Sequence, residues 1–169
     1  MTTQKYIFKK IITDFLIINL IINAAFFLFT FTDRQAILTL PFIGGDLLFG
    51  LIILGLLASL FGFVNIEKDL LKGHITPKGV SQSKLYKTLP KSLLFRVVLM
   101  ALIVIVFVYP LFYRVPIALG VHKIGYVVGL GIKTVSAGVA ATIVGLIVTY
   151  LVLGDYEALQ SWNEQVEVR

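Results

Sequence analysis

The sequence predicts an all-α integral membrane protein with four transmembrane helices, arranged as two tandem helical hairpins in a single membrane domain, residues 1–169. The 169 residues are 58% hydrophobic and only 14% charged, with a mean hydropathy of +0.95. Soluble domains are about 45–50% apolar and about 25% charged. Long stretches carry no charge, and Lys and Arg are concentrated between some of them. A soluble chain of this length with four buried helices would have too few residues left for a polar shell.

Charged residues delimit the four expected spans. Asp14 is the only charge between Lys10 and Asp33, and none occurs over 47–66, 97–113 or 134–154. A transmembrane helix needs about 20 mainly apolar residues. We therefore expect spans at about 10–31, 42–64, 93–113 and 132–153. The first apolar stretch is longer than the roughly 7–15 residues of a signal peptide and has no clear cleavage pattern after it, so we interpret it as a span.

The distribution of Lys and Arg predicts the orientation, because cytoplasmic loops carry an excess of both. One side has the residues before the first span, the loop at about 65–92 and the chain end, namely Lys5, Lys9, Lys10, Lys68, Lys72, Lys78, Lys84, Lys87, Lys91, Arg96 and Arg169. The other side has Arg34, Arg114, Lys123 and Lys133. We expect a multi-pass protein of the cell (plasma) membrane with both termini cytoplasmic. The basic loop is expected to contact anionic lipid headgroups rather than nucleic acid.

The segments between the spans leave alternatives open. The loop at 65–92 is either one or two short interfacial helices, the first ending at Gly73, or a solvated connector. The outer loop at 114–131 is unusually apolar, and it either lies on the membrane interface or belongs to a last helix that starts early and breaks near Gly129. We expect the acidic tail at 155–169 to extend the last helix and to contact the basic loop of its own or a neighbouring chain.

The two halves of the chain share a layout that is consistent with a parallel internal repeat. Aligning residues 8–15 with 90–97 places Asp14 at the depth of Arg96. Asp46 and Lys133 lie near the outer ends of the second and fourth spans. A charge inside a membrane usually faces a partner or water, so we expect two ion pairs, Asp14–Arg96 and Asp46–Lys133, between the hairpins. The alternative is that Asp14 pairs with Lys10 one turn earlier and that the other charges extend to the headgroups.

Asn19, Asn23 and Thr30 share one face of the first span, because a helix turns about 100° per residue. An amide at mid-membrane depth needs a hydrogen-bond partner. One interpretation is that these side chains hold neighbouring helices together. The other is that they line a path for a substrate or ion.

Small residues in the last span predict close helix packing. Ala137, Ala141, Gly145 and Thr149 recur every four residues, and the second span carries Gly55. This spacing lets a second backbone approach closely. The contact is expected either within one chain or between chains.

No catalytic or cofactor-binding pattern is present in the sequence. The chain has no cysteine, and His74 and His122 are expected on opposite sides of the membrane. No nucleophile motif, phosphate-binding loop or metal-ligand cluster occurs. We therefore expect no enzyme activity, no cofactor and no metal.

Three functions remain. The first is a small transporter or channel-like protein that acts as an oligomer, because four helices enclose little space. The alternative is a non-catalytic membrane subunit, such as an anchor, assembly factor or immunity-type protein, that binds another membrane protein. A lipid-binding protein is a third possibility, supported only by aromatic and basic residues near the interfaces.

Overall fold

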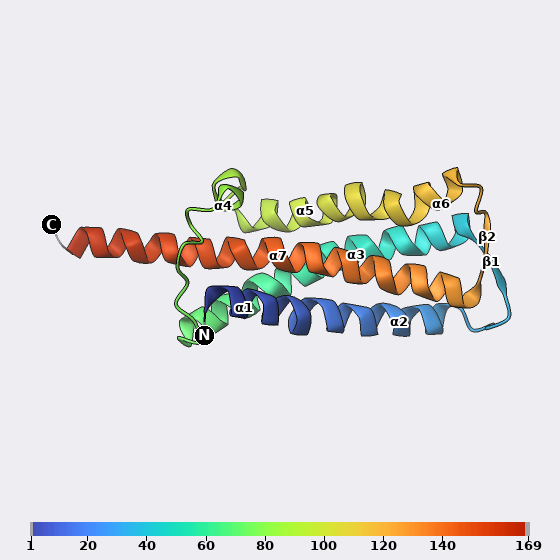
Figure 1. Ribbon diagram of the computed structural model, residues 1–169, viewed down its shortest axis with the longest axis horizontal. Helices are drawn as coiled ribbons and strands as arrows, with labels where there is room; N and C mark the ends of the chain where they lie inside the picture. Colours follow the sequence, from blue (N-terminus) through green and yellow to red (C-terminus); the bar gives the residue numbers. More distant parts are fainter. Residues whose placement is uncertain (1, 168–169) are drawn as a thin grey trace.

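The computed structural model describes the backbone of residues 2–167 and the side chains of residues 2–161. The chain is mostly helical, and four of its helices are long and apolar enough to cross a membrane. They follow one another in alternating directions (Figure 1). The first, here called the α1–α2 helix, consists of α1 (Thr3–Lys10), a π-helical stretch (Ile11–Ile17) and α2 (Ile18–Thr30), and the second is α3 (Leu40–Leu71). The third, here called the α5–α6 helix, consists of α5 (Leu93–Ile103), two π-helical stretches (Val104–Val108 and Pro110–Arg114) and α6 (Val115–Ala118). The fourth is α7 (Tyr126–Glu167).

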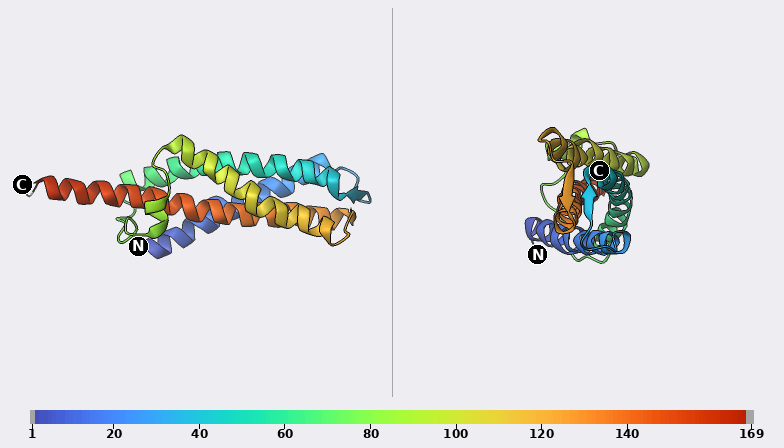
Figure 2. Two further views of the ribbon diagram at one scale, coloured as in Figure 1. Left: turned by 90° about the horizontal axis from the view of Figure 1, so that it is seen from above. Right: turned by 90° about the vertical axis from the view of Figure 1, so that its right-hand side faces the viewer.

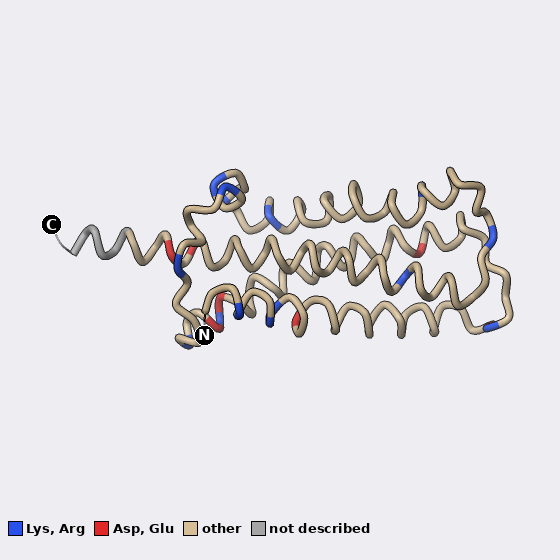
Figure 3. Tube along the Cα trace, viewed as in Figure 1, with Lys and Arg blue, Asp and Glu red and all other residues tan. Residues whose placement is uncertain are grey.

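The bundle has two distinct ends. The beginning and the end of the described chain lie at one end, here called the terminal end, and α7 extends beyond the other helices there (Figure 2). At the opposite end, here called the ribbon end, β1 (Ile37–Thr39) pairs with β2 (Lys123–Gly125) in an antiparallel ribbon, with Leu38 opposite Ile124. Charged residues gather towards the two ends, and the mid-length of the bundle is almost free of charge (Figure 3).

The fourth helix, α7, is the central element of the packing. It contacts both α3 and the α1–α2 helix along much of their length, and α3 also packs on α5. The α1–α2 helix and α3 contact each other little, although they are consecutive in the chain. The α1–α2 helix and α3 are therefore held together mainly through α7.

Glycines set the closest approaches between these helices. The ring of Phe15 fits between α3 and α7, since a Cβ at Gly62 would lie 2.5 Å from its Cζ and a Cβ at Gly145 would lie 2.7 Å from its Cγ. A Cβ at Gly55 would lie 2.6 Å from the Cα of Ala101, so α3 and α5 nearly touch backbone to backbone. Side chains at these three glycines would force the helices apart.

The membrane-flanking segments differ from the expected loops. The α5–α6 helix continues through Pro110 and Pro116 to Ala118. Proline has no N–H group for the helical hydrogen-bond ladder, and a π-helical stretch with a shifted hydrogen-bond pattern precedes each of the two prolines. The last helix does start early, at Tyr126, but it continues unbroken through Gly129. The alternative of a break near Gly129 therefore does not occur, and Phe27, Leu38 and Ile43 lie beside this glycine.

The loop between α3 and α5 packs against the bundle and is hydrogen-bonded to it, so it is not a solvated connector. Helix α3 runs on to Leu71 and ends before Gly73, which has a φ of 69°, and one short helix follows, α4 (Lys84–Thr88). Ile75 and Val80 are buried in the core. The Glu157 carboxylate of α7 accepts hydrogen bonds from the backbone N–H groups of residues 79, 80 and 81 at 2.5, 2.6 and 2.8 Å. The acidic tail therefore contacts the loop of its own chain.

Candidate functional site

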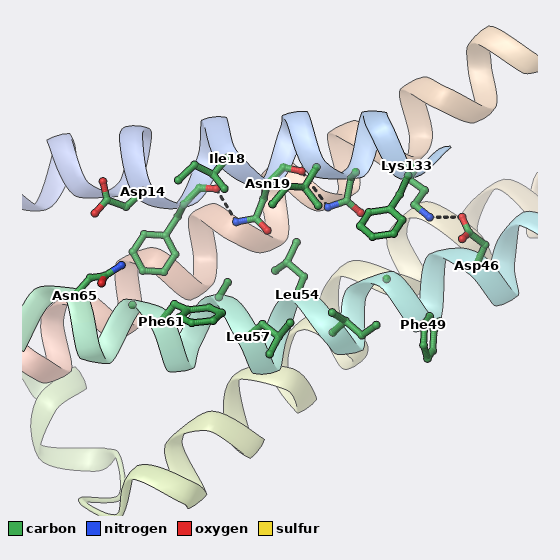
Figure 4. Close-up of a pocket in the computed structure, with 18 of the residues that line it drawn as sticks. Asp14, Ile18, Asn19, Asp46, Phe49, Leu54, Leu57, Phe61, Asn65 and Lys133 are labelled. Atoms are coloured by element: carbon green, nitrogen blue, oxygen red, sulfur yellow. Dashed lines mark hydrogen bonds and ion pairs between the residues drawn. The ribbon is translucent and has the colours of Figure 1, made fainter. Parts of the chain in front are cut away.

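A groove of about 530 Å³ lies between the α1–α2 helix and α3, which contact each other little (Figure 4). Ligand sites usually have volumes of about 300–1,000 Å³. Helix α7 contributes Lys133 to the groove, and all other lining residues come from these two helices: Asp14, Phe15, Ile18, Asn19, Ile22, Asn23 and Phe26 from the α1–α2 helix, and Asp46, Phe49, Gly50, Ile53, Leu54, Leu57, Ala58, Phe61, Gly62, Asn65 and Ile66 from α3.

The rims of the groove are exposed apolar side chains. Ile18, Ile22 and Phe26 form one rim, and Phe49, Ile53, Leu57 and Phe61 form the other. On each rim the residues recur every four positions, so each rim is a single ridge of its helix. The groove therefore opens sideways on the apolar surface of the bundle.

Asn19 and Asn23 both lie in the groove, as their shared helix face predicts. Each side-chain NH₂ group donates to the carbonyl one turn earlier in its own helix, Asn19 to Phe15 at 2.8 Å and Asn23 to Asn19 at 3.0 Å. Asn23 is only 8% exposed, and its Oδ1 faces Gly50 of α3, since a Cβ at Gly50 would lie 3.6 Å away. The amides therefore present their carbonyl oxygens to the groove and bond to no other helix among the described residues. Thr30 is exposed at the end of α2 and does not line the groove.

Lys133 and Asp46 form an ion pair that joins α7 to α3 at the ribbon end of the groove (Figure 4). Lys133 is only 3% exposed. The structure thus brings together the two residues of the expected outer pair. Their contact closes one end of the groove with a buried, internally neutralised charge.

The expected inner pair of Asp14 with Arg96 is wrong. Asp14 pairs with Lys10 at 2.5 Å, one helical turn away, and Lys10 also contacts Asp69 of α3 at 2.8 Å. Arg96 is buried and pairs with Asp155 of α7. The physical reason is that each charge has a nearer partner. Asp155 of α7 neutralises Arg96, and Lys10, one turn earlier on the same helix, neutralises Asp14.

The small-residue stripe of α7 is used within the chain. Ala137, Ala141, Gly145 and Thr149 are all buried. Gly145 receives the ring of Phe15, and the Thr149 hydroxyl donates to the Gly145 carbonyl at 2.6 Å. Gly55 packs against Ala101 of α5. These positions hold the bundle together and leave the groove as the candidate contact surface.

The two histidines do not line the groove. His74 contacts Asp69 at the terminal end, with Nδ1 3.4 Å from a carboxylate oxygen, and the His122 carbonyl accepts a hydrogen bond from the Leu40 N–H at the ribbon end. Within residues 2–161, no group of three or more His, Asp or Glu side chains could hold a metal ion. No family model, curated protein or solved structure matches this chain. The groove is therefore the feature on which a functional proposal rests.

Proposed function

We propose that the protein is a non-catalytic, multi-pass membrane protein that binds another membrane protein through the groove between the α1–α2 helix and α3. The groove carries this proposal because it combines exposed apolar rims with hydrogen-bond acceptors at its base. An apolar surface alone faces lipid at no cost, whereas polar groups inside a membrane need partners. A surface with both features favours binding of a partner within the bilayer.

The packing between α3, α5 and α7 favours binding of a partner over conduction of an ion or solute through a single chain. The space shared by α3, α5 and α7 is filled by fully buried apolar side chains, including Met100, Val104, Ala140 and Val144. A water-filled path would need polar lining. One chain therefore offers a lateral groove rather than a central channel.

The proposed placement puts both termini and the α3–α5 loop in the cytoplasm, at the plasma membrane. Lys72, Lys87 and Lys91 are exposed at the terminal end. Exposed Leu94 and Phe95 follow directly at the start of α5. Basic groups beside apolar ones suit an interface with anionic headgroups above and acyl chains below.

A second candidate is transport by an oligomer. Its support is that Asn19, Asn23 and the Asp46–Lys133 pair all line one surface. Other copies of the chain would have to cover that surface to enclose a polar path. The two candidates therefore differ in what occupies the groove.

Photo-crosslinking in native membranes tests the proposal. The photoreactive residue p-benzoylphenylalanine replaces Phe61 on the groove rim or, as a matched control, Phe107 on the α5–α6 helix. These side chains are 60% and 67% exposed. We expect the Phe61 variant to crosslink to a transmembrane segment of a different protein and the Phe107 variant to crosslink to lipid. Crosslinks between copies of this chain would favour the oligomeric transporter, and lipid adducts alone at both positions would contradict both functions.

A further inference from the structure

We propose that the occupant of the groove is a single transmembrane helix of another membrane protein, carrying a hydroxyl or amide donor at mid-membrane depth that hydrogen-bonds to Asn19 and Asn23. This inference rests on the proposed function and defines the chemistry of its partner. It follows from the length, the shape and the hydrogen-bonding state of the groove.

The length of the groove matches a helix that crosses the whole membrane. Its lining on α3 runs from Asp46 to Ile66. At a rise of about 1.5 Å per residue this wall is about 30 Å long, close to the thickness of the hydrocarbon core of a bilayer, about 30 Å. The facing wall on the α1–α2 helix runs from Asp14 to Phe26, about 18 Å, so an occupant would follow α3 along its length and touch the α1–α2 helix over its middle part.

The shape of the groove also suits a helix. The two rims are ridges with a four-residue repeat, and Gly50 and Ala58 lie between them in the lining of α3. Ridges at this spacing interdigitate with the side chains of a third helix. Small residues let that helix approach closely.

The amide oxygens define what this helix must carry. The NH₂ groups of Asn19 and Asn23 each donate one of their two protons within their own helix. Among the described residues, no side-chain or backbone donor forms a hydrogen bond with either Oδ1 atom. Lys133, the cation in the groove, is paired with Asp46. When an occupant covers the two Oδ1 atoms, each loses contact with water, and without a hydrogen-bond partner this loss is destabilising. A donor on the occupant would therefore stabilise the complex.

Thr142, the exposed hydroxyl near the middle of the α7 span, does not supply that donor in a second copy of this chain. The exposed ridges beside the groove are entirely apolar. The Thr142 hydroxyl donates its only proton to the Gly138 carbonyl at 2.8 Å. A helix from a different protein, with a Ser, Thr, Asn or Gln facing the groove, fits the acceptors better.

Two synthetic helices test the donor requirement. Both are Leu/Ala peptides of about 20 residues with lysine flanks, and they differ only in a central Ser or Ala. The full chain is reconstituted in nanodiscs and labelled at Lys72→Cys, which is exposed and distant from the groove; the absence of native cysteine makes the label unique. Binding is measured by energy transfer from a dye on the peptide.

The Ser peptide is expected to bind about 3–30-fold more tightly than the Ala peptide, the range that interhelical hydrogen bonds give. The difference should vanish in an Asn19→Leu/Asn23→Leu variant, which should still bind the Ala peptide. Equal affinities, no binding of either peptide, or a Ser advantage that persists in the variant would overturn the inference. If the variant does not fold, the comparison on the native chain still decides. If the two peptides bind equally but the Phe61 variant crosslinks to another membrane protein, only the requirement for a donor is contradicted. If the Phe61 variant crosslinks to lipid alone, the proposed function itself is contradicted.

Discussion

Lys133 of α7 and Asp46 of α3 form a buried ion pair that closes the ribbon end of the groove. The two side chains are 4% and 24% exposed, so neither charge extends freely to the surface. The pair joins α3 to α7 at the ribbon end of the groove. The shape of the groove therefore depends on this contact.

Removing one member of this pair should destabilise the protein strongly. Lys133→Met or Asp46→Leu alone should lower the free energy of unfolding by about 3–5 kcal/mol, because each leaves an uncompensated buried charge. The double variant should recover most of that loss. Unfolding titrations in mixed micelles measure all three variants. Losses that simply add in the double variant would show that the two residues act independently.

Gly145 should tolerate no side chain. Gly145→Val should lower the free energy of unfolding by about 1–3 kcal/mol or more, because its Cβ would meet the ring of Phe15 at 2.7 Å. Gly131→Ala is the control, since Gly131 is in the same helix and a Cβ there has nothing within 4 Å. That change should be neutral or stabilising by up to about 1 kcal/mol. A similar loss for both variants would mean that the contact with Phe15 is not the cause.

Double-mutant cycles should locate the partner of Arg96 on α7. Arg96→Gln combined with Asp155→Asn should show a coupling energy of about 0.5–3 kcal/mol, because the two side chains are in direct contact. Arg96→Gln combined with Asp14→Asn should be additive within about 0.5 kcal/mol. The readout is again the free energy of unfolding. Strong coupling of Arg96 to Asp14 would restore the pairing expected from the sequence.

Glu157 should hold the loop around residues 79–81 in a pH-dependent manner. Burial disfavours the charged carboxylate, but the three backbone N–H donors outweigh this effect and keep the pKa of Glu157, which lies beyond the apolar part of α7, below its usual 4.5. A lowered pKa means that the stabilisation is complete above pH 4.5 and is lost as the pH falls further.

Hydrogen exchange measures this effect at the three amides. Glu157→Gln should lower their protection factors at pH 7, and the difference from the native chain should shrink below about pH 4.5. Glu67→Gln, at an exposed position of α3, is the control and should change little. Unchanged protection in the Glu157 variant would show that Ile75 and Val80 alone hold the loop.

The sequence predicts the four helices well because each apolar stretch is bounded by charges. The sequence does not predict as well which helices contact one another. The depth of Arg96 matches that of Asp14, but depth alone does not say which helices touch, and α7 supplies a closer acid, Asp155. The Lys10–Asp14 pair, one turn apart, was the local alternative, and it is the one that forms.

Other features of the site had weaker signals. Phe15 looks like any apolar residue of the first span, and only its fit against Gly62 and Gly145 reveals its importance. Strands of three residues, such as β1 and β2, carry no periodic pattern. The groove itself lies between two helices that contact each other little, a tertiary property, although the shared face of Asn19 and Asn23 indicated one wall of it. The internal repeat stays a prediction.

The central claim is that a protein helix occupies the groove in the native membrane. Spin labels at Leu57→Cys on the groove rim and at Val106→Cys on the α5–α6 helix report collision with oxygen dissolved in lipid; the native side chains are 48% and 59% exposed. In native membranes the label at position 57 should be shielded relative to the label at 106, and purification into nanodiscs of lipid alone should remove this difference. Equal oxygen accessibility at the two positions in native membranes would contradict the claim.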